Sequence, residues 1–98
     1  MSTKQTLTPL ADVFESADDV LVVADVPGAK PSNVEVTLER SVLSFSADAG
    51  DFRYERSFEL APELDGERVS AELDAGVLRL SVPKTEAAKP RTIPVSAG

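Results

Sequence analysis

Carboxylates are the side chains of this chain that come closest to catalytic chemistry, because the sequence has no cysteine and no histidine. Thiol nucleophiles, imidazole bases, disulfides and the usual zinc ligands are therefore excluded. Glu63 and Asp65 are of the residue type that hydrolyses glycosides, but nothing in the sequence fixes the distance between them. We expect no catalytic residue and no enzyme activity.

Two further acidic stretches offer oxygen ligands for a cation. Asp18-Asp19 and the run from Asp48 to Asp51 lie in turn-like sequence, and neither has the spaced oxygen set of a calcium loop. We interpret both as solvated turns. The expectation is that the protein uses no metal and no cofactor.

The overall charge narrows the class of partner. Seventeen acidic residues against ten basic ones give a formal net charge of −7, which repels nucleic acid and anionic lipid. The alternation of aromatic and basic residues from Phe52 to Phe58 is therefore interpreted as packing rather than RNA binding. The first residues have no apolar signal core, and the run from Val20 to Ala24 is too short to span a membrane. We expect a cytoplasmic protein without nucleic-acid or membrane partners.

The elements that must position these side chains are strands. Apolar residues recur at every second position, or continuously, in residues 11–15, 20–26, 34–39, 42–46, 52–60, 69–73 and 78–82. Turn residues separate the segments, and residues 20–24 are apolar on both faces, as in a strand inside a sandwich. About seven strands without helices predict an all-β fold, an immunoglobulin-like antiparallel β-sandwich.

One hairpin is especially well marked. Val69, Ala71 and Leu73 alternate before Gly76, and apolar residues alternate again from Leu78 to Val82. Gly76 is expected to supply the positive φ of the turn. By contrast, the Arg40-Ser41 link lacks turn chemistry, and residues 47–51 are expected to turn the chain.

Arg56 has an unusual position, because the alternation of its strand places it on the apolar side with Tyr54 and Phe58. A buried arginine is costly unless it is paired. We therefore expect an Asp or Glu partner, in a structural ion pair or at an interface.

The C-terminal residues form a polar linker followed by two apolar side chains, Ile93 and Val95. A polar spacer, residues 84–92, precedes Ile93-Pro94-Val95, where the proline favours an extended backbone and the two apolar side chains lie about 6–7 Å apart on one side. This pattern predicts a docking motif. The expected organisation is a short arm at residues 1–10, a domain at 11–83 and a flexible tail at 84–98.

Taken in order, these segments resemble the α-crystallin domain of small heat-shock proteins. The matching pieces are Pro9 with residues 11–15, Asp25-Val26-Pro27-Gly28, Arg56-x-Phe58-x-Leu60-x-Pro62, Ala71 with Gly76-Val77-Leu78, Val82-Pro83-Lys84 and Ile93-x-Val95. The resemblance implies an ATP-independent holdase that binds partly unfolded client proteins and associates with itself. It also implies a dimer-interface role for Arg56.

The same resemblance implies a groove that receives the tail or a client. Its residues would be Val34, Val36, Leu38, Val69, Ala71 and Leu73. These apolar rows suit an extended, proline-containing segment.

Three features depart from the family pattern. Only about ten residues precede the first expected strand, residues 47–51 replace a longer loop whose strand is exchanged between subunits, and Ala75 stands where asparagine or aspartate is usual. We therefore expect a dimer or small oligomer rather than a large shell. Two alternatives are an adaptor like the CS-domain co-chaperones and a structural subunit that assembles with a longer paralogue.

Overall fold

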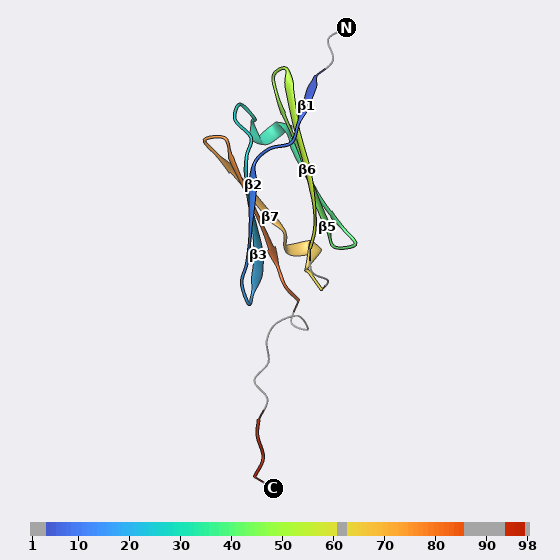
Figure 1. Ribbon diagram of the computed structural model, residues 1–98, viewed down its shortest axis with the longest axis vertical. Helices are drawn as coiled ribbons and strands as arrows, with labels where there is room; N and C mark the ends of the chain where they lie inside the picture. Colours follow the sequence, from blue (N-terminus) through green and yellow to red (C-terminus); the bar gives the residue numbers. More distant parts are fainter. Residues whose placement is uncertain (1–3, 61–62, 86–93, 98) are drawn as a thin grey trace.

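The computed structural model describes residues 4–60, 63–85 and 94–97, and it contains two four-stranded β-sheets packed face to face (Figure 1). Sheet A has the order β1 (Gln5–Leu7), β6 (Phe52–Glu59), β5 (Val42–Ala49) and β4 (Val34–Glu39). Sheet B has the order β2 (Ala11–Glu15), β3 (Asp19–Asp25), β8 (Val77–Pro83) and β7 (Ser70–Asp74). All pairings are antiparallel except that of β1 with β6. The predicted all-β sandwich is confirmed.

Helical structure in the described residues is limited to two single turns, η1 (Pro31–Asn33) and η2 (Gly66–Arg68). Each lies just before an edge strand, η1 before β4 and η2 before β7. No helix in the described ranges is long and apolar enough to cross a membrane.

The core lies between the sheets because each strand turns alternate side chains inward. The buried apolar residues are Val20, Val22, Ala24, Val26, Leu43, Phe45, Ala47, Ala49, Tyr54, Leu78, Leu80 and Val82. Leu21 and Val23 lie between these on the outer face of β3 and are only half-buried. The expectation that β3 is buried on both faces is therefore wrong, because no third layer formed by the described residues covers sheet B.

Two hairpins turn through residues with positive φ. Ala75 and Gly76, with φ of 49° and 77°, link β7 to β8, so the prediction for Gly76 is confirmed. Arg40 and Ser41, with φ of 49° and 67°, link β4 to β5. These values are those of the mirror-image type I turn, which matches the twist of two adjacent strands.

Two segments differ from the sequence-based expectation. β5 continues to Ala49, so the turn is Gly50-Asp51 alone, because the inward alternation of Phe45, Ala47 and Ala49 is unbroken. The polar N-terminal arm also contains a strand, β1, whose Gln5 N–H donates to the Asp51 carbonyl at 3.0 Å. The described part of the chain therefore has eight strands rather than about seven.

Candidate docking groove and neighbouring sites

An apolar groove runs between β4 and β7, which are the edge strands of their own sheets. Its volume is about 110 Å³, and its lining residues are Pro31, Val34, Val36, Ala71, Leu73 and Leu78. Four of the six groove residues expected from sequence are therefore brought together. Leu38 lies further along β4, and Val69 lies between η2 and β7; both are half-buried and packed against the core.

The groove follows from the alternation of β4. Val34, Val36 and Leu38 are half-buried, whereas Glu35, Thr37 and Glu39 are exposed. β4 pairs only with β5, and β7 pairs only with β8, so each strand leaves one edge unpaired within the described chain. An unpaired edge beside an apolar row suits an extended segment, which adds backbone hydrogen bonds and inserts every second side chain.

The expected docking motif is not in this groove. Ile93 lies outside the described residues, and Val95 is 94% exposed. Docking of the tail therefore stays a prediction.

Arg56 has a different intramolecular partner from the expected carboxylate. Its Nη1 donates to the carbonyl oxygen of the buried Pro9 at 2.9 Å, and the guanidinium carbon lies 4.8 Å from the Phe58 ring centroid. Within the described residues it forms no ion pair, although Asp12 and Asp25 line the same surface depression of about 480 Å³. β6 extends past the end of β1, so Arg56 reaches the crossing from β1 to β2. Its interface role stays a prediction.

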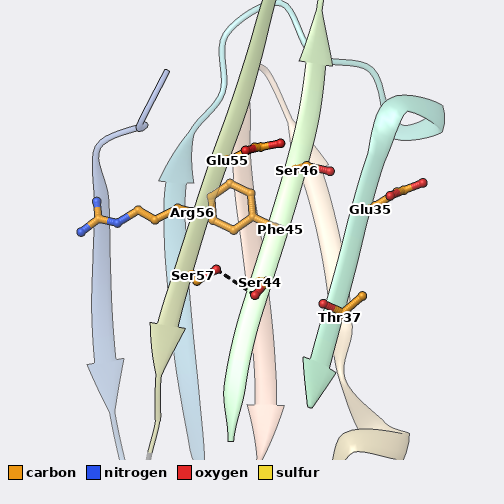
Figure 2. A pocket seen from close by; sticks show the side chains of 8 residues that line it. All are labelled: Glu35, Thr37, Ser44, Phe45, Ser46, Glu55, Arg56 and Ser57. Carbon is orange, nitrogen blue, oxygen red and sulfur yellow. Dashed lines mark hydrogen bonds between the residues drawn. The ribbon is translucent and has the colours of Figure 1, made fainter. Parts of the chain in front are cut away.

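A second, polar depression of about 220 Å³ lies on sheet A (Figure 2). Ser44 and Ser57 share a hydrogen bond of 2.8 Å across β5 and β6, while the Arg56 side chain extends away from these hydroxyls. Nearby, Glu55 accepts from Arg53 Nε at 2.6 Å, and this bond raises the pKa of Arg53. Ser44 and Ser46, which flank the apolar Phe45, are the sequence signal that could have predicted this polar face.

The acidic residues considered as possible cation ligands, and Asp65, make structural contacts instead. Asp48 of β5 contacts Lys4 at 3.3 Å and Arg53 at 3.4 Å, which ties the residue just before β1 to the β5–β6 hairpin. Asp19 Oδ1 accepts from Ser16 Oγ at 2.8 Å, and Asp65 Oδ1 accepts from the Glu67 N–H at 3.1 Å. Each of these carboxylates thus has a local role in a turn or a strand connection.

Comparison with known proteins identifies the family that has this architecture. Residues 12–96 match the model of the Hsp20/alpha crystallin family. The chain is 33% identical to the 18 kDa heat shock protein of Streptomyces albus G over 89% of this chain and 72% of that one. It is 31% identical to the 18 kDa antigen of Mycobacterium leprae, over 89% and 68%.

Solved structures of small heat-shock proteins have the same fold. A small heat-shock protein from Xylella fastidiosa superposes with a TM-score of 0.73 at 26% identity, over 93% of this chain and 98% of that one. Heat shock protein 16.0 from Schizosaccharomyces pombe gives 0.74 at 24% identity, over 91% and 77%, which shows the shared fold. The chain belongs to the Hsp20/alpha crystallin family. Its class is therefore that of the small heat-shock chaperones, not of enzymes.

Proposed function

We propose that this protein is a cytoplasmic, ATP-independent holdase, which binds partly unfolded proteins and prevents their aggregation. The observation that carries the proposal is the apolar groove between β4 and β7 in a chain of a chaperone family. Two unpaired edges beside this groove suit an unfolded segment, because such a segment offers free backbone groups and alternating apolar side chains. Self-association into a dimer or small oligomer is part of the proposal.

The tail is the proposed competitor for the groove, on the same or a neighbouring subunit. Ile93 and Val95 are two positions apart, so in extended backbone their side chains point the same way, about 6–7 Å apart. Burying both contributes about 3–5 kcal/mol before the cost of ordering the tail. Docking of this strength is reversible, so a client segment can replace the tail.

The test of holdase activity is light scattering from a heat-aggregating client without nucleotide. Suppression at near-stoichiometric ratios supports the proposal. Suppression only after a longer paralogue is added would identify a structural subunit instead. Binding to one folded partner without suppression would identify an adaptor.

The test of tail docking uses the double variant Ile93→Ser and Val95→Ser. We expect an altered assembly size by sedimentation and altered suppression of client aggregation, because both apolar side chains are removed. The matched control is Thr92→Ser with Ser96→Thr, which changes neighbouring residues and keeps the Ile93 and Val95 side chains. Unchanged assembly and activity in the serine variant would refute docking without refuting the holdase.

A further inference from the structure

The outer face of sheet B, which points away from sheet A (Figure 1), carries an open apolar surface. Leu10 and Phe14 are 79% and 55% exposed, and Leu21 and Val23 beside them are half-buried. Phe14 lies directly opposite Leu21, so their side chains share one face of the sheet. No layer formed by the described residues covers these four side chains, which together form the sheet B patch.

The charges on this face are mostly negative. Alternation along each strand turns every second side chain outward. The charged residues that the strands of sheet B direct outward are Asp12, Asp19, Asp25, Glu72, Asp74 and Arg79. Arg79 lies opposite Glu72 in the register of β7 with β8, so its charge is balanced locally. The part of the face around the sheet B patch therefore remains acidic.

A surface depression of about 480 Å³ lies at the β2 side of this face. Its lining residues are Leu10, Ala11, Asp12, Val23, Asp25 and Arg56. Arg56 supplies one positive charge, but its guanidinium already donates to the Pro9 carbonyl and lies over the Phe58 ring. Within the described residues, neither Asp12 nor Asp25 forms an ion pair. The depression thus presents two carboxylates beside an apolar wall.

We propose that the sheet B patch and this depression bind client segments in which a lysine or arginine neighbours bulky apolar residues. The basic side chain places its charged end between Asp12 and Asp25 and its aliphatic stem against the apolar wall. The apolar neighbours in the segment cover Phe14 and Leu21. The inference rests on the proposed holdase function and adds the class of client segment that this face selects.

Charge favours a cationic client over a second copy of this chain, because two copies of the same acidic face repel each other. It also separates this face from the groove between β4 and β7, whose lining is entirely apolar. Basic residues in a client therefore direct a segment to sheet B, whereas the groove does not discriminate by charge. Exposed ionic contacts are weak and are screened by salt, so binding at sheet B is reversible and salt-dependent.

The test uses the full chain and two fluorescently labelled synthetic peptides. In one peptide, lysine, leucine and phenylalanine occupy every second position, so that they share one face of an extended chain, with serine between them. In the other, glutamine replaces each lysine. We expect the lysine peptide to bind about tenfold more tightly at low salt, the effect of two exposed ionic contacts on Kd. Fluorescence anisotropy measures both affinities, and the difference should shrink at high salt.

Substitutions on the two outer faces locate the preference. Asp12→Asn with Asp25→Asn should weaken the lysine peptide to the affinity of the glutamine peptide, which itself should not change. The matched control, Glu35→Gln with Glu39→Gln, alters the net charge equally on the exposed side of β4 and should keep the preference. Phe14→Ser, at an exposed position, should weaken the lysine peptide and leave the thermal midpoint unchanged.

Equal affinities for the two peptides, or a preference lost equally in the control, would overturn the inference. Binding of the lysine peptide only after Lys89→Gln with Arg91→Gln would make the basic tail of this chain the occupant, which also contradicts it. A sedimentation change caused by Asp12→Asn with Asp25→Asn would make a second copy the occupant, with the same consequence. Client suppression on the same samples reports separately on the holdase: suppression without a lysine preference refutes only this inference.

Discussion

At the scale of single residues, two glycines with positive φ differ in their surroundings. A Cβ added to Gly76, at φ 77°, would lie 3.1 Å from Pro27 Cα, whereas one added to Gly50, at φ 62°, would meet nothing within 4 Å. The Gly76 carbonyl also accepts from Val26 N at 2.7 Å, so this turn is held against the segment after β3. Gly76 is thus required both for its backbone conformation and for close packing.

This difference predicts unequal losses for two alanine variants. Gly50→Ala should lower the free energy of unfolding by about 1–2 kcal/mol, the cost of a left-handed backbone. Gly76→Ala should lower it by about 2–4 kcal/mol, because contact with Pro27 adds to that cost. Urea denaturation measures both. Equal losses would show that the segment at Pro27 moves away freely.

Arg56 gives a second prediction at this scale. Arg56→Ala should lower the free energy of unfolding by about 1.5–3 kcal/mol, because the Pro9 carbonyl loses a charged donor and Phe58 loses a cation. Arg53→Ala is the matched control, since its ion pairs are solvent-exposed and contribute about 1 kcal/mol or less. A loss at Arg56 no greater than at Arg53 would contradict this role.

The partner of Arg56 also marks a limit of sequence reasoning. The alternation of β6 predicted that Arg56 lies on the apolar side, and its inward register opposite Phe45 agrees. Its hydrogen-bond acceptor, however, is a backbone carbonyl that any residue type would offer. Pro9 lies 47 positions away, at a crossing between the sheets. Only the packing of the sheets brings the two together.

At the scale of elements, strands with a repeating apolar pattern were predictable and the others were not. β4 and β8 were found because one face of each is apolar. β1 was missed because three residues, Gln5 to Leu7, carry no pattern and pair in parallel through tertiary contact. The end of β5 at Ala49 was available from its unbroken alternation, but the small residues Ala47 and Ala49 resemble turn sequence.

The β4–β5 hairpin yields a prediction about turn chemistry. Arg40 and Ser41 adopt left-handed backbone without the asparagine or glycine that favours it. Replacing them by Asn-Gly should raise the free energy of unfolding by about 1–2 kcal/mol. The substitution keeps the contact with Leu60, because Leu60 N donates to the backbone carbonyl at position 41, which does not depend on the Ser41 side chain.

Arg40→Ala serves as the control for this hairpin. It removes the same side chain but leaves a non-glycine residue in left-handed backbone, so no gain is expected. A gain equal to that of Asn-Gly would attribute the effect to the arginine side chain rather than to the turn.

At the scale of the whole molecule, the two open sides of the sandwich have different characters. On one side β4 and β7 form an apolar groove, and on the other β2 has an outer edge that no strand of the described residues pairs, beside Arg56. The groove proposed for the tail therefore lies at the opposite edges of the two sheets from β1 and β2.

The boundary between body and tail gives the last prediction. Lys84 Nζ contacts Glu15 Oε1 at 2.8 Å and donates to the Ser16 carbonyl at 2.8 Å, and its backbone N–H donates to Asp18. Thr85 N donates to the Glu63 carbonyl at 2.8 Å. In contrast, residues 94–97 are exposed. Truncation after Thr85 should therefore leave the thermal midpoint of the monomeric unit unchanged.

Truncation after Pro83 should instead lower the free energy of unfolding by about 2–4 kcal/mol, because it removes the Lys84 and Thr85 bonds and exposes the β2–β3 turn. Calorimetry of the two truncations under identical conditions makes the comparison, with sedimentation to check that their assembly states match. Equal midpoints would place the functional end of the domain at residue 83. A midpoint that falls already on truncation after Thr85 would show that residues 86–98 stabilise the folded body, and the tail would then be a fixed part of the fold rather than an exchangeable occupant of the groove.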